Sequence, residues 1–378
     1  MKRYVTQDNM KQSSLAAVLR YILDNGPSTR RAIQQASGFS WGTVSENAAE
    51  LIHRGYLREE KETPSGTAGR TGYRLTLDGE TVASIGLDVN LSGLTAEIVG
   101  FDGAIKHTIR RPCDAVTQQQ ILAAAQTLCD EAMAWCADKY RVMSIGVAFQ
   151  GAVDNKSGVS LRFPAADGWI PCSVKQLFEE QYRTFTYVDH DPKCMLYAKA
   201  HTLRKEGHLS DSGDLMLVRL DESIGLSVML DGHICEDVDK MELAHTLAVY
   251  DGLPCRCGRR GCLDAYASIH GICSRCGTSF DTILADPIQY APVLEEAARH
   301  LAIALHNAAM LFYPDRIILT GSCIARDETF LTRLRPIFAA LEQSPGRHTI
   351  TLCTDGNISA AYGAALKSAR EAIRELYF

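Results

Sequence analysis

Hydrophobic residues in the first 83 positions recur three and four apart in three short stretches, which is the spacing of one face of a helix. In the first stretch they are Leu15, Val18, Leu19 and Ile22. Ser28 and Ser40 are placed to cap a second helix over 29–37 and a third from 40 to about 54, with a glycine turn between them. This order predicts a helix-turn-helix whose third helix presents its N-terminal residues to a DNA major groove.

Two extended stretches, 56–60 and 73–77, follow the three helices. The residues between them are rich in glycine and carry one arginine, which favours a β-hairpin with a long tip. The hairpin and the helices together predict a winged helix-turn-helix, an α+β domain, over residues 1–83. A winged helix that contacts another protein instead of DNA is the alternative.

The start of the third helix carries the side chains best suited to read base edges, by hydrogen bonds and methyl contacts. These candidates are Ser40, Trp41, Thr43, Ser45 and Glu46. Arg30, Arg31 and Arg54 are expected to contact phosphates instead. Trp41 also fits another role, as a partly buried residue that fastens the helix in place.

Charge is distributed unevenly along the chain. Residues 1–83 carry 11 Lys and Arg against 9 Asp and Glu, whereas the remainder carries 28 against 36. Only the N-terminal segment can therefore approach a polyanion without strong repulsion. The whole chain has a net charge of −6, with 46% hydrophobic and 22% charged residues, which is the composition of a globular protein.

The sequence contains no apolar run of 18 residues, and its N-terminus lacks the apolar core of a signal peptide. We therefore expect a cytoplasmic protein with no membrane partner. Thirteen cysteines without a secretion signal indicate reduced thiols and metal binding rather than disulfides.

From residue 84 onwards, buried strands alternate with helices, a pattern typical of an α/β domain. Strands are expected at 85–89, 93–100 and 142–149, with a long helix at 118–140 before the last of them. A chain of 378 residues is too long for one ordinary domain. We predict three parts, residues 1–83, 84–190 and 191–378.

Four potential metal ligands lie close together in the second half of the chain. They are His245, Cys255, Cys257 and Cys262. Three thiols and an imidazole are a ligand set that tetrahedral zinc favours, and Gly258 and Gly261 allow tight turns between the ligands. We predict one structural zinc ion per chain. A set of buried free cysteines is the alternative.

The same segment carries a resemblance to a known family. Glu-x-x-His at 242–245, followed by Cys-x-Cys-Gly-x-x-Gly-Cys-Leu-Asp at 255–264, resembles the ROK family of bacterial repressors and sugar kinases. The resemblance is to its branch of N-acetylglucosamine- and xylose-type repressors. It implies a body with the actin-like, ribonuclease H-like, two-lobed sugar-kinase fold, an α/β architecture. The usual family wording has a glycine where Ala244 stands and a glutamate where Asp264 stands.

The resemblance also implies a sugar pocket. The residues that align with it are His190, Asp191, Glu242, His245, Asp264 and Gly151. Asp191 stands where the kinases have their catalytic base, and it can accept a hydrogen bond from a sugar hydroxyl or cap the helix that follows. His190 replaces an asparagine and Asp264 is one methylene shorter than the family residue, so the pocket fits a different or larger ligand than a plain hexose, or none. Glu242 alternatively supports a metal ligand or faces solvent.

Two phosphate-binding loops of the family kinases are altered here. The first reads Asp-Val-Asn-Leu-Ser at 88–92 and the second Asp-Glu-Ser-Ile-Gly at 221–225. Carboxylates in the second loop should repel a nucleotide, so we expect the kinase fold without kinase activity. In the family, a Gly-Arg pair at the wing enters the minor groove; it corresponds here to Gly69 and Arg70.

These observations predict a transcriptional repressor that binds a double-stranded, palindromic operator and responds to a carbohydrate or a sugar phosphate. Family members form dimers, so a homodimer or a tetramer is expected. Two alternatives stay open. One is an active sugar kinase with an added DNA-binding domain, and the other is a regulator that needs no ligand or is controlled by a partner protein.

Overall fold

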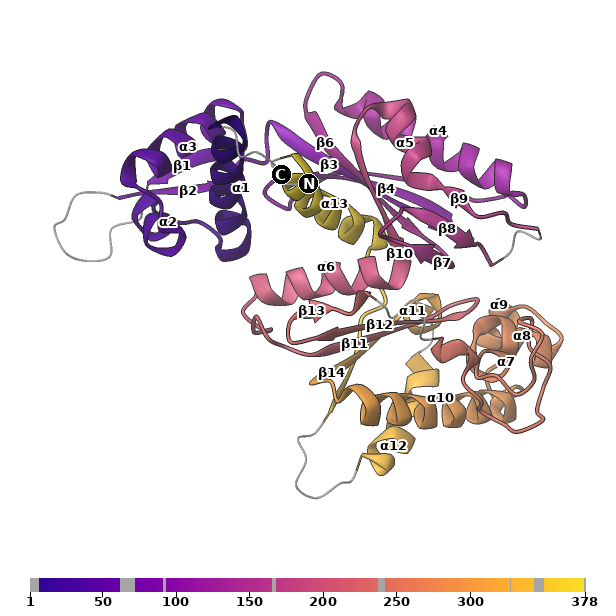
Figure 1. Ribbon diagram of the computed structural model, residues 1–378. Helices are drawn as coiled ribbons and strands as arrows, with labels where there is room; N and C mark the ends of the chain where they lie inside the picture. Colours follow the sequence, from indigo (N-terminus) through magenta and orange to yellow (C-terminus); the bar gives the residue numbers. More distant parts are fainter. Residues whose placement is uncertain are drawn as a thin grey trace, which may run out of the picture. The chain divides into compact units, whose positions relative to one another are not determined.

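The structure is a computed structural model, and it describes residues 7–61, 72–90, 93–164, 168–236, 242–326, 328–342 and 350–376. Contacts divide the chain into two compact units. The first unit comprises residues 1–191 and 360–378, and the second comprises residues 192–359 (Figure 1). The predicted division placed everything after residue 190 in one part, whereas the last segment of the chain returns to the first unit. Among the described residues, no helix is both long enough and apolar enough to cross a membrane.

The N-terminal part of the first unit has the predicted winged-helix elements in the predicted order. They are α1 (Gln7–Asn25), α2 (Arg30–Ser37), α3 (Trp41–His53), β1 (Leu57–Lys61) and β2 (Tyr73–Leu77), and the two strands pair antiparallel. We call residues 7–77 the head. Residues 62–71, which include Gly69 and Arg70, lie outside the described residues.

One predicted helix cap is wrong. Thr29, not Ser28, caps α2, because the Thr29 hydroxyl accepts a hydrogen bond from the backbone N–H of Ala32. The backbone of Ser28 instead pairs with Leu75 of the wing, so Ser28 lies one position too early to start the helix. The predicted cap of α3 is confirmed, since the Ser40 hydroxyl accepts from the N–H of Thr43.

The rest of the first unit is built on a five-stranded sheet. Its strands are β3 (Val82–Asn90), β4 (Gly93–Gly100), β5 (Ile105–Arg111), β6 (Arg141–Phe149) and β10 (Phe185–His190), with α4 (Gln118–Cys136) and α5 (Val174–Tyr182) between them in the chain. The spatial order is β10-β6-β3-β4-β5. A small sheet of β7 (Ala152–Asp154), β8 (Val159–Arg162) and β9 (Cys172–Ser173) follows β6.

The second unit repeats this topology. After α6 (Asp191–Lys205) come β11 (Leu215–Leu220), β12 (Ile224–Leu230), β13 (His233–Ile234), β14 (Arg316–Thr320) and β15 (Thr351–Thr354), in the spatial order β13-β12-β11-β14-β15. In both units the first three strands form an antiparallel meander, and the fourth and fifth join parallel on the other side of the first. Two copies of this strand order confirm the predicted two-lobed, ribonuclease H-like fold.

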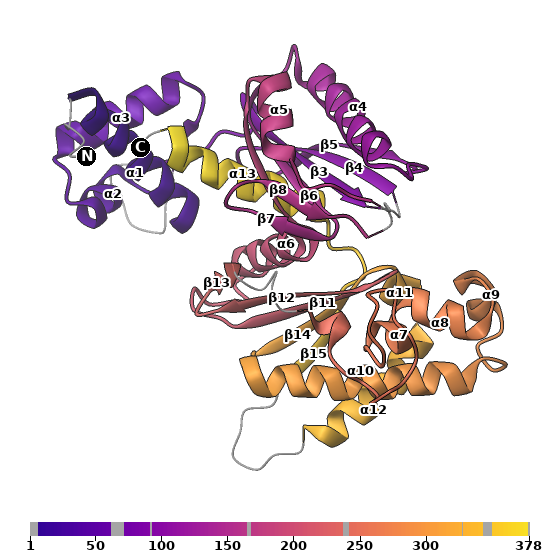
Figure 2. The ribbon, with the colours of Figure 1, turned by 45° about the vertical axis from the view of Figure 1, so that its right-hand side comes forward.

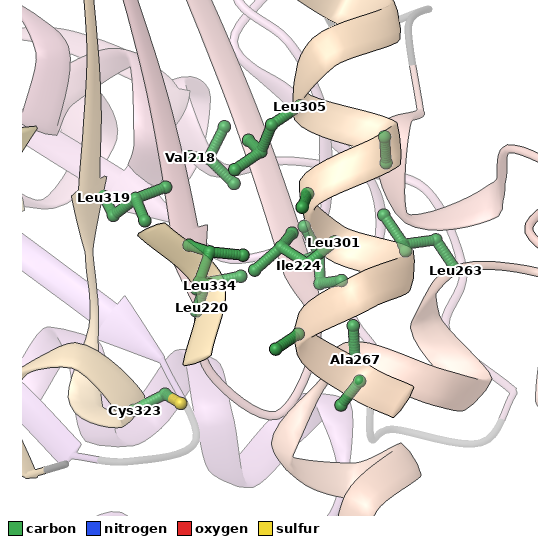
Figure 3. Packing of buried hydrophobic residues seen from close by; sticks show 14 of the residues in the cluster. Val218, Leu220, Ile224, Leu263, Ala267, Leu301, Leu305, Leu319, Cys323 and Leu334 are labelled. Carbon is green, nitrogen blue, oxygen red and sulfur yellow. The ribbon is translucent and has the colours of Figure 1, made fainter. Parts of the chain in front are cut away.

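The helices of the second unit that follow β13 contribute side chains to its largest apolar core. They are α7 (Asp264–Ala267), α8 (Ile269–Cys276), α9 (Phe280–Ala285), α10 (Ala291–Phe312), α11 (Ser322–Arg326) and α12 (Glu328–Leu341). Leu301 and Leu305 of α10 point toward Val218 and Ile224 of the sheet, as Figure 3 shows, and all four are buried. Because α10 is apolar on this side along much of its length, the burial of these side chains stabilises its packing in the core of the second unit.

The last helix, α13 (Ala360–Leu376), lies along the sheet of the first unit in both ribbon views (Figures 1 and 2). Two glycines permit this close approach. A Cβ on Gly86 would lie 1.8 Å from the carbonyl oxygen of Ala361, and one on Gly146 would lie 2.0 Å from that of Ala364. These contacts explain why the chain returns to the first unit after residue 359.

The far end of α13 packs against the head. Ala372 and Ile373 belong to the same buried cluster as Leu15 of α1, and Arg370 forms an ion pair with Asp24 at 2.6 Å. The head and the first lobe therefore share one apolar core, to which α13 contributes its second half.

Candidate metal centre, ligand-binding residues and DNA-facing helix

The four predicted metal ligands meet in the second unit. One side-chain atom from each of His245, Cys255, Cys257 and Cys262 lies within 4.8 Å of the others. The histidine comes from the short 3-10 helix η2 (Leu243–His245), and the thiols come from the loop before α7. Gly261 adopts a φ of 74°, and a Cβ there would lie 1.8 Å from the carbonyl oxygen of Val249. Only glycine fits this turn between the ligands.

The distances in this cluster fit a tetrahedral ion. The sulfurs of Cys257 and Cys262 are 3.7 Å apart, as are the sulfur of Cys255 and Nδ1 of His245. Zinc–ligand bonds of about 2.3 Å to sulfur and about 2.0 Å to nitrogen give tetrahedral edges of about 3.8 and 3.5 Å. The chain therefore has a His-Cys₃ cluster that can hold a metal ion, as the spacing predicted.

Glu242 orients the imidazole of this cluster. Its Oε2 lies 3.3 Å from Nε2 of His245, while Nδ1 of the ring faces the thiols. A carboxylate on the outer nitrogen holds the tautomer in which the inner nitrogen can bind metal. Glu242 and His245 were predicted as sugar contacts, and that role stays a prediction; the contact between them supports the alternative role for Glu242, as the partner of a metal ligand.

The three thiols ionise differently. Burial raises the pKa of Cys255, and it raises the pKa of Cys262 to about 12. Burial acts on Cys257 in the same direction, but hydrogen bonds from the side chain and backbone of Arg259 and from the other two thiols outweigh it and lower the pKa of Cys257 to about 7. Cys257 is therefore the thiol that most readily provides the thiolate form that binds metals.

Asp264, predicted as a sugar contact, makes its hydrogen bonds within the protein. Its side chain is 1% exposed. Oδ1 accepts hydrogen bonds from the Ser223 hydroxyl at 2.8 Å and from the backbone N–H of Ile224 at 3.3 Å, and Oδ2 lies 3.2 Å from Nε of Arg256. These contacts favour a structural role for Asp264. The sugar contact stays a prediction.

Arg256 is the residue of this site that the sequence reasoning missed. It lies between the ligands Cys255 and Cys257, and it donates both to Asp264 and to the backbone carbonyl of Glu222. Arg256 thereby ties the metal loop to the loop at 221–225. Its only signal in the sequence is its position between two ligands, because the partner at Glu222 is 34 residues away.

Asp221 closes the other end of the same loop. Its Oδ1 accepts from the backbone N–H of Ser322 at 2.9 Å and from the Ser322 hydroxyl, and its Oδ2 lies 2.5 Å from Nε of Arg219. The Asp221 residue is 5% exposed. Donors that follow β14 thus already hold a carboxylate of the chain, in the loop that the sequence resemblance matched to a phosphate-binding loop.

The remaining predicted pocket residues lie in the first unit. Asp191 is buried at 2% exposure, and its Oδ1 lies 3.3 Å from Nε2 of His190. Helix α6 starts at Asp191, so the carboxylate stands in its first turn, which suits the helix as well as a ligand. Gly151 has a φ of 98°, and a Cβ there would lie 2.2 Å from the carbonyl oxygen of Arg162. Local packing alone therefore requires this glycine.

At the start of α3, two of the five predicted DNA contacts make hydrogen bonds within the helix cap. The hydroxyls of Ser40 and Thr43 lie 2.9 Å apart, and the Ser40 hydroxyl also accepts from the N–H of Thr43. Trp41 and Glu46 are exposed, and Ser45 is partly exposed. The structure thus leaves Trp41, Ser45 and Glu46 as the side chains that face outward.

The predicted phosphate-binding arginines differ in their partners. Arg30 forms an ion pair with Glu59 at 2.6 Å, and Arg54 forms one with Glu50 at 2.7 Å. Arg31 is exposed, and within the described part of the chain it makes no ion pair. All three remain candidates, because an exposed ion pair of this kind is weak and can open to meet a phosphate.

Comparison with known proteins identifies relatives of the whole chain. A model of the ROK family matches residues 84–370. The chain is 21% identical to the xylose repressor of Bacillus spizizenii over 87% of each chain. It is 24% identical to the DNA-binding transcriptional dual regulator NagC of Escherichia coli, over 86% of this chain and 84% of that one.

A solved structure with the same fold also spans the chain. It is the crystal structure of a ROK family transcriptional regulator, a homolog of the Escherichia coli MLC protein, with a TM-score of 0.77 and 18% identity. The match covers 98% of this chain and 99% of the other, so the likeness of fold includes the head as well as the two-lobed body.

Proposed function

The chain belongs to the ROK family, and from this premise we propose that it is a DNA-binding transcriptional repressor whose two-lobed body binds a carbohydrate or a sugar phosphate. One observation supports the proposal above all: the chain contains a winged helix, and this winged helix packs against a body with the two-lobed fold. Its α3 presents an exposed N-terminal surface, and Arg31 lies nearby on α2 for contact with phosphates.

We propose further that the body lacks kinase activity. Two buried carboxylates support this. The Asp221 carboxylate accepts a hydrogen bond from the backbone N–H of Ser322. The Asp264 carboxylate accepts hydrogen bonds from Ser223 and Ile224 of the loop. A nucleotide phosphate would have to displace the first carboxylate and then lie next to it, which like charges oppose. Asp191 stands at the position of the family base, and without a phosphate donor its role is to accept a hydrogen bond from a ligand hydroxyl.

The metal centre is proposed to hold one structural zinc ion through His245, Cys255, Cys257 and Cys262. Zinc would close the loop 245–262 and keep it folded. His190, Asp191 and Gly151 of the first unit, and Glu242, His245 and Asp264 of the second, remain the candidate contacts of the carbohydrate.

We propose that the ligand acts by favouring one arrangement of the two units over another. Its affinity must differ between the arrangements for operator binding to change. A homodimer would present two heads to a palindromic operator, with wing residues Gly69 and Arg70 reaching the minor groove. The dimer, the palindrome and the wing contacts are carried over from the family resemblance.

Two measurements on the full-length protein test the proposal. The first selects bound duplexes from a random DNA pool, and enrichment of one sequence is expected. The second titrates the selected duplex in the presence of sugars, amino sugars and sugar phosphates, one of which should change its affinity several-fold. If no duplex is enriched, the repressor assignment is wrong.

A kinase assay separates the alternatives. Transfer of phosphate from ATP to any sugar of the same panel, at an enzyme-like rate, would show that the body is a kinase. DNA binding that no carbohydrate alters would instead leave a regulator controlled by another signal, such as a partner protein.

A further inference from the structure

The outward face of α3 contains no positive charge. Along the helix Trp41–His53 there is neither lysine nor arginine. Apart from Thr43 and Glu50, which are partly exposed, the exposed or partly exposed positions of its first turns fall on one side. They are Trp41, Gly42, Ser45, Glu46 and Ala49. At 100° per residue they span an arc of about 140°. Guanine is most often read by arginine or lysine, so this face is not built to read guanine in that way.

Other polar residues of α3 are excluded from base contacts by their partners. Asn47, a residue type that reads adenine, is 3% exposed and donates to the Ser14 hydroxyl inside the head. Ser40 and Thr43 are engaged in the helix cap, and Glu50 lies more than two turns after Trp41, beyond the N-terminal residues that enter the groove. Glu46 makes no ion pair among the described residues, so it is the charged group that this face offers.

A carboxylate facing a major groove requires a hydrogen-bond donor on the base. Cytosine provides one in its N4 amino group, whereas adenine places the N7 acceptor beside its amino group. Guanine and thymine present acceptors there, which would repel Glu46. Cytosine is therefore the base that the Glu46 carboxylate favours.

Trp41 supplies the second element of the face. It is 53% exposed at the first position of the helix, and an exposed indole matches the C5-methyl group of thymine, the one apolar feature of the major groove. Gly42 stands beside it, and a Cβ on Gly42 would meet only the Ser40 hydroxyl, at 3.7 Å. Packing within the head does not require this glycine, which instead allows the helix to come closer to a partner.

We infer that α3 reads an operator half-site containing a cytosine, bound by Glu46, and a nearby thymine, bound by Trp41. This inference rests on the proposed DNA-binding function and adds the base identities to it. Ser45 lies between the two residues around the helix and tolerates either a donor or an acceptor on the base between them.

The test uses the full-length protein and the duplex enriched from a random pool. Each cytosine of the half-site is replaced in turn, and each thymine is replaced by deoxyuridine, which removes only the methyl group. Wild-type affinity should fall about tenfold at one cytosine and several-fold at one thymine. Glu46→Ala should lose the cytosine preference, and Trp41→Ala should lose the sensitivity to deoxyuridine.

Glu295→Gln serves as the control, since Glu295 is exposed on α10 of the second unit. Thermal melts of each variant check that the head is folded. The inference is overturned if Glu46→Ala keeps the cytosine preference, or if Trp41→Ala responds to deoxyuridine as the wild type does. Failure of the wild type to enrich any duplex would instead count against the DNA-binding function itself.

Discussion

Asp264, a predicted sugar contact, has a buried carboxylate that accepts hydrogen bonds from Ser223, Ile224 and Arg256. A side chain with three donors around it contributes to stability whether or not a ligand binds. The two roles can be separated, because a sugar contact and an internal contact respond differently to truncation.

Asp264→Ala should destabilise the second unit by about 3 kcal/mol, since it leaves buried donors without an acceptor and Arg256 without its carboxylate. Urea unfolding measures this loss. Asp251→Asn is the control, because Asp251 pairs with Arg260 at an exposed site and asparagine tolerates the left-handed backbone there, so the change should cost nothing measurable. A variant that loses carbohydrate affinity while its unfolding curve is unchanged would show that Asp264 contacts the ligand instead.

The metal set could be predicted from the sequence because its ligands are local. Three thiols within eight residues must lie near one another, and the glycines between them indicate the turns. The partners of Arg256 and Asp221 could not be predicted in this way. Glu222 is 34 residues from Arg256 and Ser322 is 101 residues from Asp221, so only the folded sheet brings these groups together.

Among the elements of the second unit, the loop that carries the thiols is expected to depend on the proposed metal ion. Purified protein should contain about one zinc per chain, and Cys257→Ser should lower both the zinc content and the melting temperature. A loss of about 2 kcal/mol would shift the midpoint by about 5 °C. Elemental analysis and a thermal melt measure the two effects.

Cys273→Ser is the matched control for the metal loop. Cys273 lies on α8 outside the ligand cluster, so its substitution should leave the zinc content unchanged. Equal zinc in the Cys257→Ser and wild-type proteins would contradict the assignment of the thiol as a ligand.

Helix α10 is rich in apolar residues, and the structure shows which of them are buried. Leu301 is fully buried against the sheet (Figure 3). Leu311 of the same helix is 80% exposed. Leu301→Ala should cost about 2–5 kcal/mol of unfolding free energy, and Leu311→Ala should cost almost nothing. Denaturant titration compares the two. Similar losses in both variants would mean that α10 is buried along its other side as well.

The predicted elements agree closely with those observed. The division of the chain into two units could not be predicted from the spacing of its apolar residues. Helix α13 contains small residues that suit close packing, and its partner sheet could not be identified from that pattern. Gly86 and Gly146 are the reason, because their missing side chains accept the backbone of α13. Glycines more than 200 positions away carry no signal of this contact in a single sequence.

For the whole molecule, we expect α13 to be the element through which the proposed ligand acts on the head. It begins at residue 360, where the chain re-enters the first unit, and Arg370 pairs with Asp24 of α1 near its other end. A shift of the second unit that moves this connection is therefore passed to a helix in direct contact with the head. The coupling can be measured as the ratio of operator affinities with and without the effector.

Arg370→Glu should reduce this ratio, because it places like charges at Asp24 and loosens the head from α13. The ratio is expected to change by about two- to fivefold, which corresponds to the energy of an exposed ion pair. Operator affinity measured without the effector should change by no more than the same factor. Arg374→Glu is the control on the same helix, since Arg374 pairs only with Glu371 of α13 among the described residues. If both variants respond to the effector as the wild type does, the signal reaches the head through the connection at residues 191–192, and α13 serves only to hold the head on the body.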